Sequence, residues 1–253
     1  MLGHPNNNIY QSVKVLVDSN FRNNKADPVN NFKYDLDKVI NRVSRIYVES
    51  SQIPFTYYTT TTNNNVFETS LGTVTLSPGN YNSGNIAMVL KNELDVSAAA
   101  GAPWTVVFDL ITLKLTISSA VAFSIVTTTA NTMASELGFN SDTAVNTSHV
   151  GDGVVNLSGP RYLVIKSSLI GENRAFTTAV APEVSSRNII QTIPVNTNPG
   201  GVVLDSMSNP RYNILGFKTS FHKDIDFRLE DDKGNLLELN GNDWSVQLIF
   251  ELR

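Results

Sequence analysis

The chain has 253 residues, a length that can bury a substantial core as one β domain with an insertion. Its 41% hydrophobic and 17% charged residues exclude a disordered polyelectrolyte, and its net charge of −4 argues against binding to nucleic acid or anionic lipid. Cysteine is absent, and no stretch has the pattern of an export signal or the apolar length of a membrane helix. The sequence therefore predicts a soluble protein that folds in a reducing cytoplasm.

Three strands are predicted in the first part of the chain. Apolar residues alternate with polar ones, which is the period of a strand with one buried face, at residues 13–17, 32–36 and 46–53. Pro54 is expected to stop the third strand, because proline has no backbone N–H to donate to a neighbour.

The middle of the chain has a different pattern. The expected elements are a strand at 72–76, a helix at 86–94, strands at 104–108, 113–117 and 121–125, and a short helix at 132–137. Ser83 is the expected N-cap of the first helix, and Gly138 is the expected left-handed residue that ends the second. The sequence thus predicts a β-α-β-β-β-α unit at residues 66–150, inserted into a domain made of residues 1–65 and 151–253.

Strand patterns return in the last part of the chain, at residues 163–165, 189–195, 214–218 and 225–229. The stretch from Leu229 to Glu251 alternates on both sides of Gly234-Asn235, which predicts a closing β-hairpin that runs almost to the last residue. The segment from Asn173 to Pro210 lacks clear strands over most of its length, and this predicts a long functional loop.

A search for catalytic residues finds no known motif. The three histidines lie far apart without metal-ligand spacing, and phosphate-loop and Gly-x-Ser-x-Gly sequences are absent. The only acidic cluster alternates with the apolar residues of a predicted strand, which favours a solvated strand face over a calcium site; its members are Asp224, Asp226, Asp231 and Asp232. We therefore predict no catalytic, cofactor-binding or metal-binding residues and no enzyme activity.

Two other functions stay open at this point. Trp104 and Trp244 fall at inward strand positions and are expected in the core, but a carbohydrate- or receptor-binding module would instead need an exposed aromatic patch, for which the candidates are Tyr57, Tyr58 and Tyr81. A hydrolase would need two carboxylates about 5–10 Å apart in a cleft.

Motifs at the start, middle and end of the chain resemble one known family. They are Val17-Asp18-Ser19-Asn20-x-Arg22 with Asn31-Phe32-x-Tyr34-x-Leu36; Pro78-Gly79-Asn80-Tyr81 with Trp104-Thr105-Val106; and Gly234-Asn235-x-Leu237-x-Leu239-Asn240-Gly241-x-Asp243-Trp244-Ser245. This ordered set is similar to that of single jelly-roll penton proteins, the vertex minor capsid proteins of large DNA viruses, virophages and related elements.

The resemblance implies a fold and a function. The fold would be mainly β, a single jelly-roll sandwich with an inserted α/β unit, and the function would be that of a penton, a homopentamer at the fivefold vertices of an icosahedral capsid. Another minor capsid protein is the alternative. The implied partners are other copies of the chain, neighbouring major and minor capsid proteins, and a host receptor that contacts the 66–150 unit. No nucleic acid, membrane insertion or cofactor is expected, and the implied location is the virion.

Overall fold

The computed structural model describes residues 11–169, 188–206 and 224–252, except for the side chain of Asp224. The chain divides into two compact units. One unit consists of Met1–Tyr57 together with Pro160–Arg253, and the other is the continuous stretch Tyr58–Gly159.

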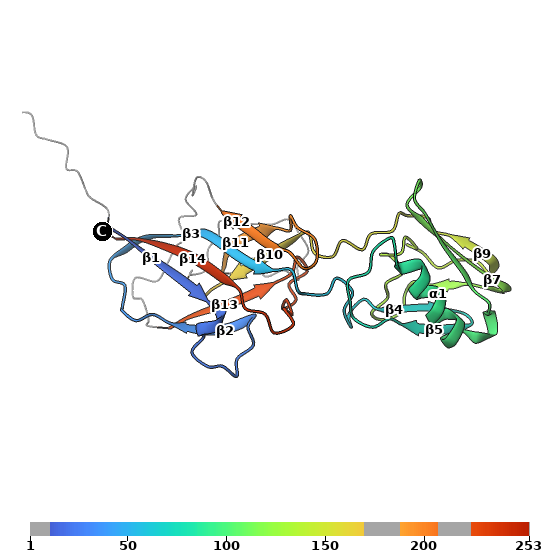
Figure 1. Cartoon of the computed structure of the whole chain (residues 1–253), viewed down its shortest axis with the longest axis horizontal. Helices are drawn as coiled ribbons and strands as arrows, with labels where there is room; N and C mark the ends of the chain where they lie inside the picture. The colour runs from blue at the N-terminus through green and yellow to red at the C-terminus, as the bar shows by residue number, and fades with distance from the viewer. Residues whose placement is uncertain (1–10, 170–187, 207–223, 253) are drawn as a thin grey trace, which may run out of the picture. The chain divides into compact units, whose positions relative to one another are not determined.

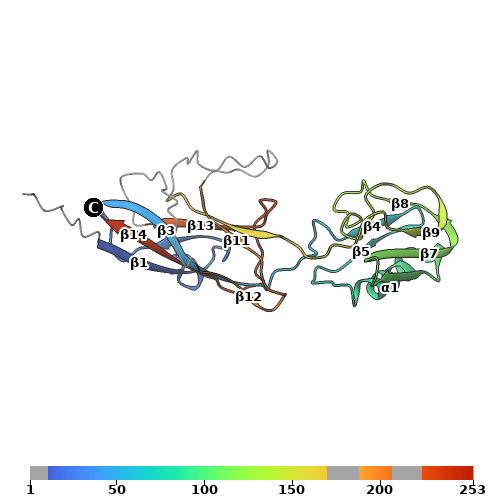
Figure 2. The same cartoon turned by 90° about the horizontal axis from the view of Figure 1, so that it is seen from above.

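Two four-stranded sheets form the first unit (Figures 1 and 2). One sheet has the order β1 (Gln11–Asp18), β14 (Ser245–Leu252), β3 (Val43–Pro54) and β12 (Val202–Ser206). The other has the order β11 (Ile189–Pro194), β10 (Tyr162–Lys166), β13 (Asp224–Glu230) and β2 (Asn31–Asp35). All neighbouring strands in both sheets are antiparallel.

The connectivity of these sheets is that of a jelly roll. When the eight described strands of this unit are counted in chain order, one sheet reads first, eighth, third, sixth, and the other reads fifth, fourth, seventh, second. Consecutive strands therefore alternate between the two sheets almost throughout, as in two nested Greek keys. The inner faces of both sheets share one apolar core that includes Val17, Ile46 and Phe227. The predicted mainly β jelly-roll fold is confirmed.

The predicted closing hairpin is wrong. Its two strands, β13 and β14, lie in different sheets. A tight turn does follow β13, because the Asp231 N–H donates to the Asn235 carbonyl at 2.9 Å and the Leu237 N–H donates to the Leu229 carbonyl at 3.0 Å. The chain then crosses to the other sheet before β14 begins. Alternation identifies the buried face of a strand and does not identify the strand that pairs with it.

The long segment from Asn173 to Pro210 also differs from the prediction. Its described part contains β11, which the sequence predicted, and β12, an edge strand that it did not. This part is therefore integral to both sheets rather than a loop. The strand predicted at 214–218 and the N-terminal residues 1–8 lie outside the described residues.

The second unit has two three-stranded sheets and one helix (Figure 1). One sheet has the order β5 (Gly72–Thr75), β4 (Val66–Thr69) and β8 (Ile125–Val126), and the other has the order β6 (Thr105–Asp109), β7 (Lys114–Phe123) and β9 (Asn146–Val150). Helix α1 (Ile86–Ser97) buries Ile86, Leu90 and Leu94 in a core that the sheets also line. Single 3-10 turns occur at Ser19–Phe21 in the first unit and Ala99–Gly101 in the second.

Three local predictions in this unit need correction. Helix α1 begins after Asn85 rather than near Ser83, because Asn82 and Asn85 bond to each other and form the preceding turn. Residues 132–137 form turns and not a helix, although Gly138 does adopt the predicted left-handed φ of 86°. The strand predicted at 121–125 is divided between two sheets, since β7 continues to Phe123 and Ile125 begins β8.

The second unit is also wider than the predicted range of 66–150. On its N-terminal side, Thr60 and Gly79 exchange two backbone hydrogen bonds. On its C-terminal side, the Val155 N–H donates to the Leu113 carbonyl at 2.8 Å, and Leu157 packs against the core. These flanking segments carry few alternating apolar residues, so the strand pattern does not reveal that they belong to the unit.

Candidate functional site

The titratable residues that the sequence singled out, so far as they lie in the described part of the chain, do not assemble into a reaction centre. Across the described ranges, no group of three or more His, Asp and Glu side chains is placed to hold a metal ion. His149 is buried: its Nε2 lies 2.8 Å from the Phe123 carbonyl oxygen, and its ring packs edge-on against the Phe123 ring. His149 is thus part of the core of the second unit, while His4 and His222 lie outside the described residues.

The acidic residues near β13 serve local structure. Asp231 accepts hydrogen bonds from the N–H groups of Lys233 and Asn235, at 2.9 and 2.8 Å, and so fixes the turn that follows the strand. Asp226 accepts a bond from the Ser168 N–H, and Asp232 accepts one from the Arg161 N–H. Each of these carboxylates bonds to a backbone group of this unit, an arrangement that differs from the several convergent oxygens of a calcium site.

A buried carboxylate that the sequence analysis missed lies at the end of β13. Glu230 is buried, its Oε2 lies 2.5 Å from the Lys166 Nζ, and its Oε1 pairs with Arg228. Lys166 is on the neighbouring strand β10. Each carboxylate oxygen of Glu230 therefore has a cationic partner, and the pair with Lys166 links β10 to β13.

The three candidate tyrosines, all within the described residues, do not form the exposed patch that a sugar-binding module needs. Both tryptophans are buried, as predicted. Tyr57 is also buried and stacks on Phe55 with ring centroids 4.1 Å apart, and burial raises the pKa of its hydroxyl. Tyr81 is half-buried against the core of the second unit, and its hydroxyl donates to the Ser77 carbonyl at 2.7 Å. Of the three candidate tyrosines, only Tyr58 is exposed.

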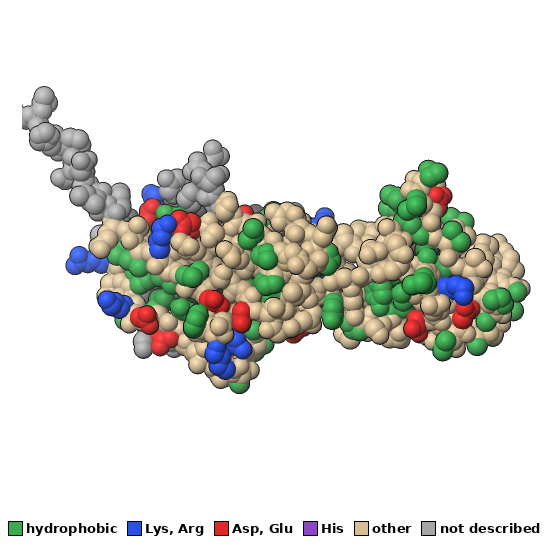
Figure 3. Space-filling view, viewed as in Figure 1, with side chains coloured by type: hydrophobic (Ala, Val, Ile, Leu, Met, Phe, Trp, Pro, Cys, Tyr) green, Lys and Arg blue, Asp and Glu red, His purple; other side chains and the backbone are tan. Residues whose placement is uncertain are grey.

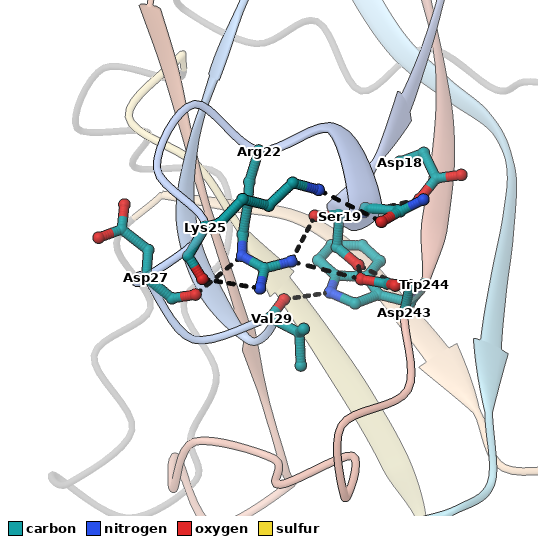
Figure 4. Close-up of polar contacts among 9 residues, drawn as sticks. Asp18, Ser19, Arg22, Lys25, Asp27, Val29, Asp243 and Trp244 are labelled. Atoms are coloured by element: carbon teal, nitrogen blue, oxygen red, sulfur yellow. Dashed lines mark hydrogen bonds and ion pairs between the residues drawn. The ribbon is translucent and has the colours of Figure 1, made fainter.

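A polar cluster of the first unit joins the segment that follows β1 to the residues just before β14 (Figure 4). The Arg22 guanidinium donates to the carbonyl oxygens of Asp27, Ser19 and Lys25, at 2.8, 2.9 and 3.1 Å, and lies 3.5 Å from the Asp243 carboxylate. We call Ser19, Arg22, Asp243 and Trp244 the Arg22 clamp.

Hydrogen bonds through Ser19 complete the clamp. Its hydroxyl donates to Asp243 at 2.7 Å and accepts from the Trp244 N–H at 3.0 Å, while the Trp244 indole N–H donates to the Val29 carbonyl at 2.7 Å. The opening motif that ends at Arg22 and the closing motif around Trp244 therefore meet in space. The residues of the two motifs thus have a structural role: they hold the loop between β1 and β2 against the residues that precede β14.

We expect Arg22→Ala to lower the free energy of unfolding by about 2 kcal/mol, because three carbonyls lose a charged donor. Chemical denaturation measures this loss. Arg22→Lys is the matched variant: it keeps the charge but cannot reach three carbonyls from one planar group, so a loss of similar size is expected. A lysine variant as stable as the wild type would show that charge alone matters at this position.

The outer face of the β1-β14-β3-β12 sheet is a candidate assembly surface. Because Val13, Val15 and Val17 pack inward, the intervening Lys14 and Leu16 face outward. The Lys14 Nζ lies 2.6 Å from Glu49 of β3, and the exposed Leu204 lies on the edge strand β12. Hydrophobic side chains and charges of both signs are interspersed on the visible face of this unit (Figure 3). The exposed Leu16 and Leu204 are the apolar groups that this face offers for contact with another subunit.

Comparison with known proteins identifies the fold. No protein-family model matches the chain, and no curated protein sequence matches it. Among solved structures, the chain is similar to the crystal structure of the mavirus penton protein, with a TM-score of 0.55 and 11% identity over 96% of this chain and 99% of that chain. It is also similar to a chain of the cryo-EM structure of the Sputnik virophage, with a TM-score of 0.51 and 11% identity over 95% of this chain and 97% of that chain.

These similarities extend across both units, since either unit alone is much shorter than the matched length. The chain therefore has the fold of a jelly-roll penton with an inserted α/β unit. The resemblance seen in the sequence is confirmed at the level of the fold.

Proposed function

We propose that this chain is a penton, a structural capsid subunit that forms a homopentamer at the fivefold vertices of an icosahedral virus shell. The observation that carries the proposal is the near-complete match, jelly roll and inserted unit together, to the mavirus penton protein. A β-sandwich alone hosts many functions, but the match covers 96% of this chain and therefore includes the unit inserted between β3 and β10.

The requirements of a closed ring support this proposal. Each subunit of a pentamer must present two different surfaces, one to each neighbour, and the rotation between subunits must close after five copies. The first unit offers an outer sheet face with exposed Leu16 near one edge and exposed Leu204 near the other. The proposed work of the chain is contact with copies of itself and with neighbouring capsid proteins, and it requires no catalytic residues.

Cryo-electron microscopy of intact particles tests the proposal. We expect density for this chain at every fivefold vertex, with five copies around the axis. Density at quasi-sixfold positions would instead identify a different capsid protein, and absence from the particle would rule out a capsid role. The isolated protein is a weaker test, because pentamer formation can depend on neighbouring capsid proteins.

A further inference from the structure

The turn between β6 and β7 carries exposed aliphatic side chains. Leu110 is 77% exposed, Ile111 is 92% exposed and Leu113 is 48% exposed. Val154 is also exposed, and it lies near Leu113, because the next residue, Val155, donates its N–H to the Leu113 carbonyl at 2.8 Å. We call Leu110, Ile111, Leu113 and Val154 the apolar tip. Hydrophobic side chains gather at a projecting end of the second unit (Figures 1 and 3).

Asp109 holds this turn in one conformation. Its Oδ1 accepts hydrogen bonds from the N–H groups of Ile111 and Thr112, at 2.8 and 3.4 Å, and its Oδ2 accepts one from the Thr112 hydroxyl at 2.8 Å. Its carbonyl accepts the Leu113 N–H at 2.8 Å. These hydrogen bonds hold the pKa of the Asp109 carboxyl below its usual value, so the carboxylate stays ionised at neutral pH.

The hydrogen bonds have a consequence for burial of the tip. An apolar environment penalises every backbone donor that lacks a partner. The N–H groups of residues 111, 112 and 113 all have partners within the turn. The tip can therefore enter an apolar environment without leaving these donors unpaired, and it does not have to change its backbone first.

The chemistry of the tip favours lipid over a protein pocket. Side chains that dominate protein interfaces are chiefly Trp, Tyr and Arg, and the apolar tip has none of them. A convex pair of aliphatic residues needs no preformed pocket in a fluid bilayer. We propose that the apolar tip docks on the surface of an uncharged lipid bilayer and inserts Leu110 and Ile111 into its interfacial layer.

Charge selects the kind of lipid. The second unit, residues 58–159, has two lysines and no arginine against seven carboxylates. An anionic membrane surface would repel it, whereas a zwitterionic surface would not. The sequence predicted no membrane insertion from charge and apolar length, and none of the described helices is long and apolar enough to cross a membrane. Neither criterion concerns a short aliphatic turn that docks at the surface.

A few side chains give weak attachment, so several copies must act together. In this respect the inference rests on the proposed function, because a capsid displays many copies of the chain.

A vesicle-capture experiment tests the inference. The full-length chain is coupled at high density to beads and incubated with fluorescent phosphatidylcholine vesicles. We expect capture by the wild type and a loss of about tenfold or more in the double variant Leu110→Ser/Ile111→Ser, since burial of even one such side chain is worth about a tenfold step in affinity. Replacing about one fifth of the lipid with phosphatidylserine should also reduce capture.

Val96→Ser is the matched control, because Val96 is 77% exposed on helix α1 and is not part of the tip; its capture should equal that of the wild type. Equal capture by the wild type and the double variant would overturn the inference. So would failure of the wild type to bind neutral vesicles, the outcome expected if the tip fits a protein pocket. Because the beads provide many copies whatever the chain's own assembly, these results do not depend on whether it forms pentamers.

Discussion

Replacing Trp244 with alanine is expected to lower the free energy of unfolding of the jelly-roll unit by about 3–5 kcal/mol. The side chain is only 3% exposed, and its ring packs edge-on against Phe32 and Phe227, with centroid distances of 5.9 and 6.4 Å. The substitution leaves a cavity between the sheets and removes the donor that satisfies the Val29 carbonyl. Trp244→Phe should cost less, because it keeps an aromatic ring and loses mainly the hydrogen bond.

Trp104→Ala is the matched change in the other unit. Trp104 is buried against Phe123, with a centroid distance of 4.7 Å, and donates its indole N–H to the Ala98 carbonyl at 2.9 Å. The two apolar cores have no residue in common, so each alanine variant should lower one calorimetric transition and leave the other in place. If Trp244→Ala lowered both transitions equally, the units would unfold as one cooperative body. A melting temperature that barely changed would contradict the burial of Trp244.

Sequence patterns predicted most strands that have one clearly buried face. In β1, Val13, Val15 and Val17 all face the core, and the alternation is visible over the whole strand. In β9, by contrast, His149 is the only buried residue, so the strand Asn146–Val150 gave no apolar period. The short strands β4, which is central in its sheet, and β12, which lies at a sheet edge, were also missed, because each has a single buried apolar residue, Phe67 and Val203. Such strands form because a neighbouring strand offers hydrogen bonds, and that neighbour is not visible locally.

Contacts between distant parts of the chain were beyond the sequence patterns. The Ser19 hydroxyl bonds to Asp243, 224 residues away, and no spacing rule predicts such a pair. The family resemblance did mark both ends of the chain, but it did not indicate that they touch. The apolar tip had a visible signal that was not used: Leu110 and Ile111 are apolar residues in the turn between two predicted strands, where polar residues are expected.

The two units should also separate physically. Deletion of residues 58–159, with Tyr57 joined to Pro160 through about four Gly or Ser residues, is expected to leave a soluble jelly roll that melts cooperatively. The two connecting segments are adjacent where they enter the second unit, because a Cβ built on Gly159 would lie 2.6 Å from the Thr59 Cγ2. A short linker can therefore close the gap without pulling on β3 or β10. Solubility, circular dichroism and calorimetry measure the outcome.

A narrower deletion that joins Asn63 to Asp152, close to the boundaries predicted from the sequence, is the matched control. It leaves Val155 and Leu157 attached to the jelly roll without the core on which they pack. It also removes Gly79, the backbone partner of Thr60. Val155, Leu157 and Thr60 would then lack the partners that they have in the whole chain. The narrower deletion should therefore be less soluble than the wider one, since it exposes apolar side chains and unpaired backbone groups. If the wider deletion aggregates while the narrower one folds, the jelly roll depends on the segments next to the second unit, and the division at Tyr58 and Gly159 is not a domain boundary.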